Sequence, residues 1–166
     1  PQFEQTLHSI ANEIRHLIQG LRPIMLQYGL SMGLRDLVEE LATQTKGEIA
    51  IKLEIPATSV RYPAEVELHL YRIIQQACQN VIKHARAKSL TISGLFEEDH
   101  LEVRVIDDGI GFMTGGMVSR EKMLSDRHFG LAGMYERAAL VGAQLLIESV
   151  PDQGTQVIVT WTRNRK

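Results

Sequence analysis

Residues 89–112 read SLTISGLFEEDHLEVRVIDDGIGF, and their pattern gives the first indication of the fold class. Residues 89–96 and 101–106 have the apolar and β-branched composition of strands, and the polar segment 97–100 between them indicates a turn. Strands joined by so short a connection pair in antiparallel fashion. The second strand leads into Asp107-Asp108-Gly109-Ile110-Gly111-Phe112, whose two glycines permit positive φ and the close approach of a ligand. Taken alone, the Asp-Gly sequence also fits a plain turn.

Outward from this hairpin, helices and strands follow one another with few helices in total. The pattern predicts a helix at 32–45 with Ser31 as its N-cap, an alternating strand at 49–55, a long helix at 63–85, a helix at 131–141, and strands at 144–149 and 156–161. The order from residue 30 to residue 162 is therefore α-β-α-β-β-α-β-β. Hairpins of this kind predict an α+β fold, a two-layer sandwich whose mixed, largely antiparallel sheet carries helices on one face.

The first 21 residues have a narrower pattern. Apolar residues recur in steps of four and three, as in an a/d heptad seam, at Phe3, Leu7, Ile10, Ile14, Leu17 and Leu21. Such a narrow stripe fits a helical bundle with a partner helix better than a helix on a wide core, although an ordinary amphipathic helix remains the alternative. Pro23 ends or bends this helix.

Composition excludes several classes of protein. The chain has 166 residues, 44% hydrophobic and 23% charged, which is ordinary globular usage. A net charge of −2 argues against a nucleic-acid surface, and no apolar run is long enough to span a membrane. Cys78 is the sole cysteine, which suits a reducing compartment. We expect a cytoplasmic location without membrane contact for these residues, and leave open a membrane anchor elsewhere in a longer protein.

Two more segments have residue types that suit a nucleotide. Asn80 offers an amide oxygen that can hold a hydrated Mg²⁺, and Lys83 or His84 can meet phosphate, although a solvated polar face explains the same residues. Gly130-Leu131-Ala132-Gly133 opens a helix, where free amide groups favour phosphate, although a tight helix–sheet contact also calls for glycine. The polar stretch 113–129 between the glycine segments is either a lid or a surface loop.

Taken in order, these segments resemble the ATP-binding domain of bacterial sensor histidine kinases, in the group shared with DNA gyrase and the large heat-shock chaperone ATPases. The similar segments are the N box at 71–85, the first glycine box at 107–112, the second glycine box at 128–138 and the Gly-Thr motif at 154–157. Leu21-Arg22-Pro23, with the later Gly29-Leu30 and Gly33-Leu34, resembles the junction of the nitrate-sensor and desaturase-thermosensor subfamily.

The resemblance implies a Bergerat-type ATP-binding fold with ATP and Mg²⁺ as ligands. Asp107 would accept a hydrogen bond from the adenine amine, Asn80 would coordinate Mg²⁺, and Lys83 and His84 would face the phosphates. The other residues that would line the nucleotide are Gly109, Gly111, Gly130, Leu131, Gly133, Met134 and Thr155. Residues 1–23 would belong to a bundle that forms a homodimer, 24–162 to the ATP-binding domain and 163–166 to a basic tail. The longer protein would phosphorylate itself on a histidine and pass the phosphate to a response regulator.

Two departures from the family pattern matter. Gln76 stands where the N box usually carries a glutamate, and an amide cannot take up a proton as a carboxylate can. Neither His8 nor His16 is followed by the acidic residue expected beside the phosphoacceptor, so these residues should bind ATP without phosphorylating themselves. Gln76 motivates a second hypothesis, a degenerate nucleotide-sensing or docking module. An anti-sigma-type serine kinase of the same fold is a third, which the bundle helix and the junction disfavour.

Overall fold

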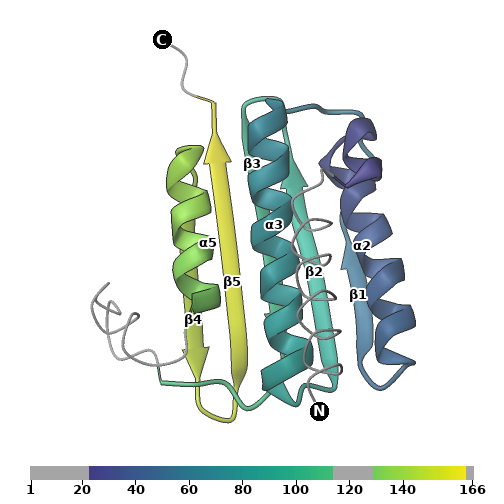
Figure 1. Ribbon diagram of the computed structural model, residues 1–166, viewed down its shortest axis with the longest axis vertical. Coiled ribbons are helices and arrows are strands. Elements are labelled where there is room, and N and C mark those ends of the chain that lie inside the picture. Colours follow the sequence, from purple (N-terminus) through teal and green to yellow (C-terminus); the bar gives the residue numbers. More distant parts are fainter. Residues whose placement is uncertain (1–22, 114–128, 164–166) are drawn as a thin grey trace, which may run out of the picture.

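The computed structural model describes residues 23–113 and 129–163 (Figure 1). The bundle helix expected within residues 1–23, most of the lid expected at 113–129, and most of the basic tail lie outside these ranges. The elements in chain order are η1 (Ile24–Tyr28), α2 (Leu30–Thr45), β1 (Ala50–Glu54), α3 (Ala64–Asn80), η2 (Val81–Ala85), β2 (Ser89–Phe96), β3 (His100–Asp107), α5 (Phe129–Leu140), β4 (Gln144–Val150) and β5 (Gly154–Thr162). None of these helices combines the length and the apolar composition needed to cross a membrane.

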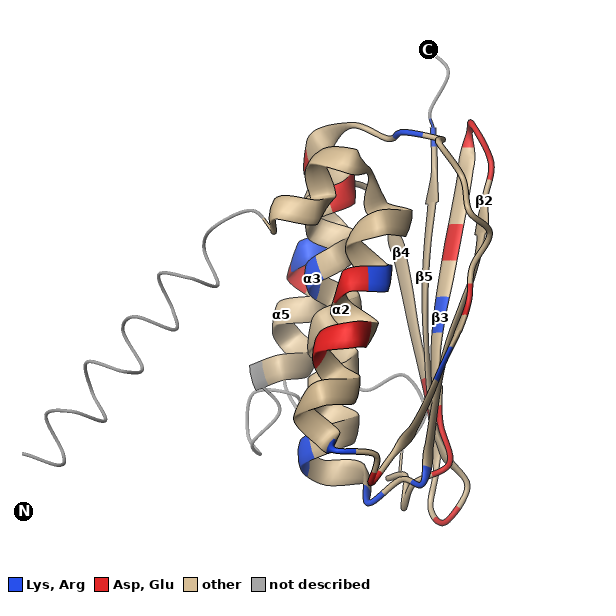
Figure 2. Cartoon of the chain, turned by 90° about the vertical axis from the view of Figure 1, so that its right-hand side faces the viewer, with Lys and Arg blue, Asp and Glu red and all other residues tan. Residues whose placement is uncertain are grey.

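The five strands form one mixed sheet in the order β1-β2-β3-β5-β4. The β1–β2 pair is parallel, and the β2–β3, β3–β5 and β4–β5 pairs are antiparallel. Figure 2 shows the helices of the described residues gathered on one side of the sheet, and none of these helices covers the opposite side. The predicted two-layer α+β sandwich is therefore confirmed, because hairpins keep successive strands together and leave the helices to cover one face.

Two helix ends differ from the sequence expectation. Helix α2 begins at Leu30 with Gly29 as its N-cap, and Ser31 instead donates its hydroxyl to the carbonyl oxygen of Pro56 at 3.1 Å. The prediction of Ser31 as the cap is wrong because a tertiary hydrogen bond takes up the hydroxyl within the first turn. The long helix changes after Asn80 into a π-helical turn, η2, which ends at Arg86 in the left-handed conformation.

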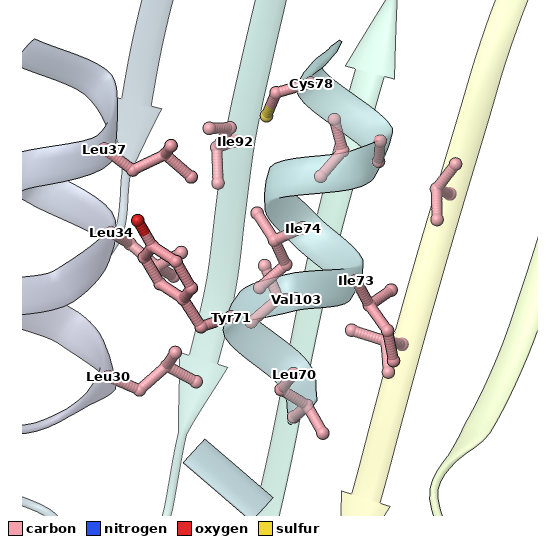
Figure 3. Close-up of a cluster of buried hydrophobic side chains, with 14 of the residues drawn as sticks. Leu30, Leu34, Leu37, Leu70, Tyr71, Ile73, Ile74, Cys78, Ile92 and Val103 are labelled. Atoms are coloured by element: carbon pink, nitrogen blue, oxygen red, sulfur yellow. The ribbon is translucent and has the colours of Figure 1, made fainter. Parts of the chain in front are cut away.

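The core fills the space between α2, α3 and the covered face of the sheet. The side chains of Leu30, Leu34 and Leu37 point from α2 toward α3 (Figure 3). The ring of Tyr71 lies between the two helices. All three leucines are at most 1% exposed. Cys78 is also fully buried, and burial raises the pKa of its thiol to about 12. The cysteine is therefore a packing residue, as free cysteines usually are.

A second set of contacts closes the end of the sandwich near the start of α3. Tyr62 meets the ring of Trp161 edge-on at a centroid distance of 5.7 Å, and the indole N–H donates to the carbonyl oxygen of Val141. Glu67, fully buried, accepts two hydrogen bonds from the Arg61 guanidinium, at 2.9 and 3.1 Å, and one from the backbone N–H of Tyr62. A buried carboxylate needs this degree of pairing.

Candidate functional site

A cavity of about 530 Å³ lies between α3, η2, the start of α5 and the ends of β3 and β5 that meet there. This volume falls within the range of about 300–1,000 Å³ that is usual for small-molecule sites. The lining residues are Gln76, Ala77, Asn80, Val81, Lys83, His84, Ala85, Val105, Asp107, Ile110, Gly111, Phe112, Gly130, Leu131, Ile147, Thr155 and Val157. The lining thus combines an apolar interior with a few polar groups, as is usual in small-molecule sites.

Asp107 places a buried carboxylate in this lining. It is the last residue of β3 and is 6% exposed. Its Oδ1 accepts the backbone N–H of Gly109 at 2.8 Å, and the backbone N–H of Thr155 donates to the same carboxylate. Burial raises the pKa of Asp107, and these two hydrogen bonds oppose the rise. A carboxylate fixed in this way can accept a further hydrogen bond from an amino group in the cavity.

The neighbouring aspartate has a different role. The Oδ1 atom of Asp108 accepts the backbone N–H groups of Lys88 and Ser89, both at 2.8 Å. These hydrogen bonds, that from Ser89 foremost, lower the pKa of Asp108. Asp108 therefore ties the loop after β3 to the start of β2.

Glycines let three backbone segments meet beside Asp107. Gly111 has φ +56° and Gly154 has φ +84°, a region that other residues rarely adopt. A Cβ atom at Gly111 would collide with the carbonyl oxygen of Val150, and one at Gly154 would collide with that of Asp107. A Cβ atom at Gly109 would likewise strike the carbonyl oxygen of Ala85. The glycine-rich loop, η2 and the β4–β5 turn are therefore in direct backbone contact.

Ser149 completes this wall from the edge strand β4. The Ser149 side chain is 5% exposed, and its hydroxyl group accepts the backbone N–H of Phe112 at 2.9 Å and reaches the carbonyl oxygen of Gly154 at 3.0 Å. It also lies 2.9 Å from the hydroxyl oxygen of Thr155. One hydroxyl group thus links the glycine-rich loop to the turn that presents Thr155 to the cavity.

The opposite wall comes from α3 and η2. The Gln76 side-chain Nε2 donates to Asn80 Oδ1 at 3.0 Å, and both amides are half-buried. Lys83 and His84 follow on η2 with exposed side chains at the rim. Their placement depends on the π-helical turn, and such turns recur at functional sites.

Asn80 fits the limited demand of a hydrated Mg²⁺. This ion retains most of its waters and takes one or two protein oxygens, and Asn80 presents an amide oxygen on the cavity wall. Within residues 23–113 and 129–163, no group of three His, Cys, Asp or Glu residues could hold a metal ion by itself. The donor set therefore fits a cation that is shared with a ligand rather than a closed metal centre.

Most of the site residues expected from the sequence lie together in this lining. They are Gln76, Asn80, Lys83, His84, Asp107, Gly111, Gly130, Leu131 and Thr155. Three expected residues are not part of this lining: Gly109, Gly133 and Met134. The backbone N–H of Gly109 donates to the Asp107 carboxylate, and Met134 is buried in the core, 1% exposed. A Cβ atom at Gly133 would face open space, so protein packing does not require glycine there.

Sequence reasoning missed Asp108, Ser149 and the Gln76–Asn80 hydrogen bond. Asp108 adjoins the recognised aspartate, and a polar residue at an inward-facing position of an apolar strand was the available signal for Ser149. The amide pair left a weaker signal, the spacing of four residues on a helix.

Comparisons with known proteins agree with this geometry. Residues 65–165 match the family described as "Histidine kinase-, DNA gyrase B-, and HSP90-like ATPase". The sensor protein VraS of Staphylococcus epidermidis is 35% identical over the whole chain, and that of Staphylococcus saprophyticus is 32% identical. The chain spans about 45% of the length of these curated relatives.

Solved structures show the same fold at low sequence identity. The histidine kinase domain of the Erythrobacter litoralis EL346 blue-light activated kinase has a TM-score of 0.64 at 18% identity, covering 80% of this chain and 60% of that one. The Acinetobacter baumannii histidine kinase AdeS also has a TM-score of 0.64, at 14% identity, covering 97% and 84%. Nothing in these comparisons supports a degenerate module. Because the family match covers more than half of the residues, the chain belongs to the histidine kinase-, DNA gyrase B-, and HSP90-like ATPase family.

Proposed function

We propose that this chain is the ATP-binding catalytic domain of a two-component sensor histidine kinase. In the longer protein it would present ATP to a histidine, which becomes phosphorylated and passes the phosphate to a response regulator. The observation that carries the proposal is Asp107, a buried carboxylate fixed by two backbone N–H groups inside a largely apolar cavity. Its setting matches what an adenine ring with an exocyclic amine requires.

The base end of the site is formed by the sheet and the glycine-rich loop. The ionised Asp107 carboxylate would accept a hydrogen bond from the adenine amine. Val105, Ile147 and Val157, which line the cavity, would contact the ring. Ser149 would keep Thr155 oriented beside Asp107 through the hydroxyl–hydroxyl contact of 2.9 Å. These groups orient the base and exclude water from it.

The phosphate end would lie toward η2 and the start of α5. Lys83 and His84 at the rim would provide positive charge and N–H donors, and Gly130 would let phosphate approach the first amide groups of α5. Asn80 would hold Mg²⁺, which when bound neutralises charge on the transferring phosphoryl group. In this arrangement the residues of the domain position the phosphates, and catalysis rests on that positioning.

We further infer that the longer protein belongs to the nitrate-sensor and desaturase-thermosensor subfamily and acts in the cytoplasm as a homodimer. Support comes from the junction Leu21-Arg22-Pro23 and from the heptad pattern of the first 21 residues. The dimer would form through the helical bundle that contains residues 1–23, and the response regulator would be its phosphate acceptor.

Isothermal titration calorimetry with ADP and with a non-hydrolysable ATP analogue tests the proposal. Asp107→Asn replaces a charged acceptor by an amide, and loss of a charge-assisted hydrogen bond of about 1.5–3 kcal/mol should weaken affinity about 10- to 150-fold. Asp108→Asn is the matched control, because its side chain faces the backbone of Lys88 and Ser89. Failure of the folded parent chain to bind either nucleotide would overturn the proposal, as would an unchanged affinity in Asp107→Asn.

The pH dependence supplies a second test of Asp107. Burial raises its pKa above the ordinary value of 3.8, so acidification should remove the acceptor, and weaken nucleotide binding, at a higher pH than for an exposed aspartate. The folded state then binds this proton more tightly than the unfolded state, so the group's contribution to stability decreases as the pH rises from 3.8 through the folded pKa. Calorimetry and thermal unfolding across this interval should therefore show opposite trends in Asp107-dependent affinity and stability. A parallel trend would contradict the assignment.

A further inference from the structure

The amide pair Gln76–Asn80 sits on the wall where a divalent cation would bind. Gln76 Nε2 donates to Asn80 Oδ1 at 3.0 Å, and both side chains line the cavity. This oxygen is the same atom that Asn80 would offer to Mg²⁺. A carboxylate at position 76 could not donate in this way, because an ionised carboxylate only accepts hydrogen bonds.

Packing holds the pair in this arrangement. Gln76 and Asn80 are one helical turn apart on α3, and both are half-buried. An added Cβ at Gly130 would lie 3.0 Å from Gln76 Nε2 and 3.5 Å from Asn80 Oδ1, so the first turn of α5 lies directly against the two amides. Because Gly130 has no side chain, the Gln76 side chain has room to reach Asn80.

The charges on the cavity wall also bear on how much a divalent cation contributes to binding. Lys83 contributes a positive charge at the rim, and the carboxylate of Asp107 comes from the end of β3. Gln76 adds no negative charge to the lining near Asn80. Compared with a glutamate at this position, the neutral amide of Gln76 does not repel a polyphosphate in the cavity. It also attracts a divalent cation less strongly.

We propose that Gln76 is a positioning residue that engages the side-chain oxygen of Asn80 and so reduces the contribution of a divalent cation to nucleotide binding by this chain. The inference rests on the proposed function, because it assumes that the cavity takes a nucleoside polyphosphate. The hydrogen bond satisfies one lone pair of Asn80 Oδ1 and lowers its capacity as a metal ligand. Nucleotide binding then depends mainly on Asp107 and on the cationic rim.

Two variants separate the hydrogen bond from the charge. Gln76→Met removes the amide and adds no charge, and Gln76→Glu removes the donor and adds a carboxylate. Helix propensities of Gln, Met and Glu are similar, so α3 should fold in each variant. Gln79→Glu is the control, since its amide lies 3.5 Å from Gln44 Oε1 and is not part of the cavity lining.

The readout is the affinity for ADP by calorimetry, measured in Mg²⁺ and in EDTA, with circular dichroism to confirm folding. In the parent chain and in Gln79→Glu, the two affinities should agree within about threefold. Freeing Asn80 in Gln76→Met should raise the preference for Mg²⁺ by about three- to tenfold, the equivalent of one hydrogen bond. The carboxylate in Gln76→Glu should raise it further and should weaken binding in EDTA.

Two results would overturn the inference while leaving the proposed function standing. One is a parent chain that binds ADP at least tenfold more tightly with Mg²⁺ than with EDTA. The other is a Gln76→Met variant whose Mg²⁺ preference equals that of the parent, which would assign any effect of Gln76→Glu to charge alone. If no folded form of the chain binds ADP under either condition, the proposed function itself fails.

Discussion

Helix α3 lies between a packed apolar region and a cavity that contains polar groups. Toward α2, large apolar side chains pack against the helix, and Leu30, Leu34 and Leu37 are at most 1% exposed (Figure 3). Toward α5, the same helix presents Gln76, Ala77 and Asn80 to a cavity of about 530 Å³. Figure 1 shows α3 between α2 and α5 over the same sheet.

One helix can therefore border a cavity on one side and contribute to the core on the other. Side chains on the α2 side bury apolar surface, which is the main source of stability. The α5 side leaves a volume unfilled and holds a half-buried amide pair and a buried carboxylate, which contribute little to stability or reduce it. We therefore expect substitutions on the α2 side to change stability and those on the cavity side to change ligand binding.

The largest effect should come from the packed side. Leu34→Ala removes a fully buried side chain and should lower the free energy of unfolding by about 2–5 kcal/mol. The affinity of the folded fraction for nucleotide should stay within about twofold. Urea unfolding and calorimetry measure the two quantities, and Leu140→Ala, at a side chain that is 72% exposed, is the control. A loss of less than about 1 kcal/mol would mean that this region is not the main source of stability.

A second substitution tests whether a residue of the cavity lining can also be important for stability. Gly111 lines the cavity, yet Gly111→Ala should cost about 1–3 kcal/mol of stability because its φ is +56° and an added Cβ would strike the carbonyl oxygen of Val150. Gly142→Ala is the matched control, with φ +67° and no atom within 4 Å of the added Cβ. Thermal unfolding should show the larger loss for Gly111→Ala. Equal losses would mean that backbone conformation matters at Gly111 and the close contact does not.

The smallest effect concerns the pair of aspartates. Asp108→Ala should lower stability at pH 7 by about 1 kcal/mol, since solvent screens hydrogen bonds at an exposed carboxylate. The pKa of Asp108 is lowered by these bonds, so its contribution is complete above pH 3.8 and is lost as the pH falls through the folded pKa. Urea unfolding of parent and variant should therefore converge at acidic pH, with nucleotide affinity unchanged at pH 7. A gap that persists at low pH would argue against the role of the charge.

The fold was predictable where a local pattern and the tertiary environment agree. Alternating apolar residues in 49–55 predicted a strand, and β1 forms there because the two faces of the sheet meet different surroundings. The N-cap at Ser31 was wrong because its hydroxyl bonds to Pro56, 25 residues away. The π-helical turn at Val81–Ala85 has no clear sequence signal and was missed.

The residues of the site were predictable in part, but their hydrogen-bond partners were not. The order of the glycine and asparagine motifs placed Asn80, Asp107 and Thr155, which the structure brings into one cavity lining. Hydrogen-bond partners were not predictable, since the side chain that Gln76 meets depends on how closely α5 approaches α3. Which of these groups contact nucleotide remains a prediction.

Trp161, packed against Tyr62, is the single tryptophan of the chain and lies six residues along β5 from Thr155. At about 3.3 Å per residue, the indole and the start of β5 are roughly 20 Å apart. Its intrinsic fluorescence should therefore follow unfolding and remain insensitive to direct quenching by a bound base. The same separation suits resonance energy transfer from the indole to a fluorescent nucleotide analogue, so one chromophore can report both the integrity of the domain and the occupancy of the cavity.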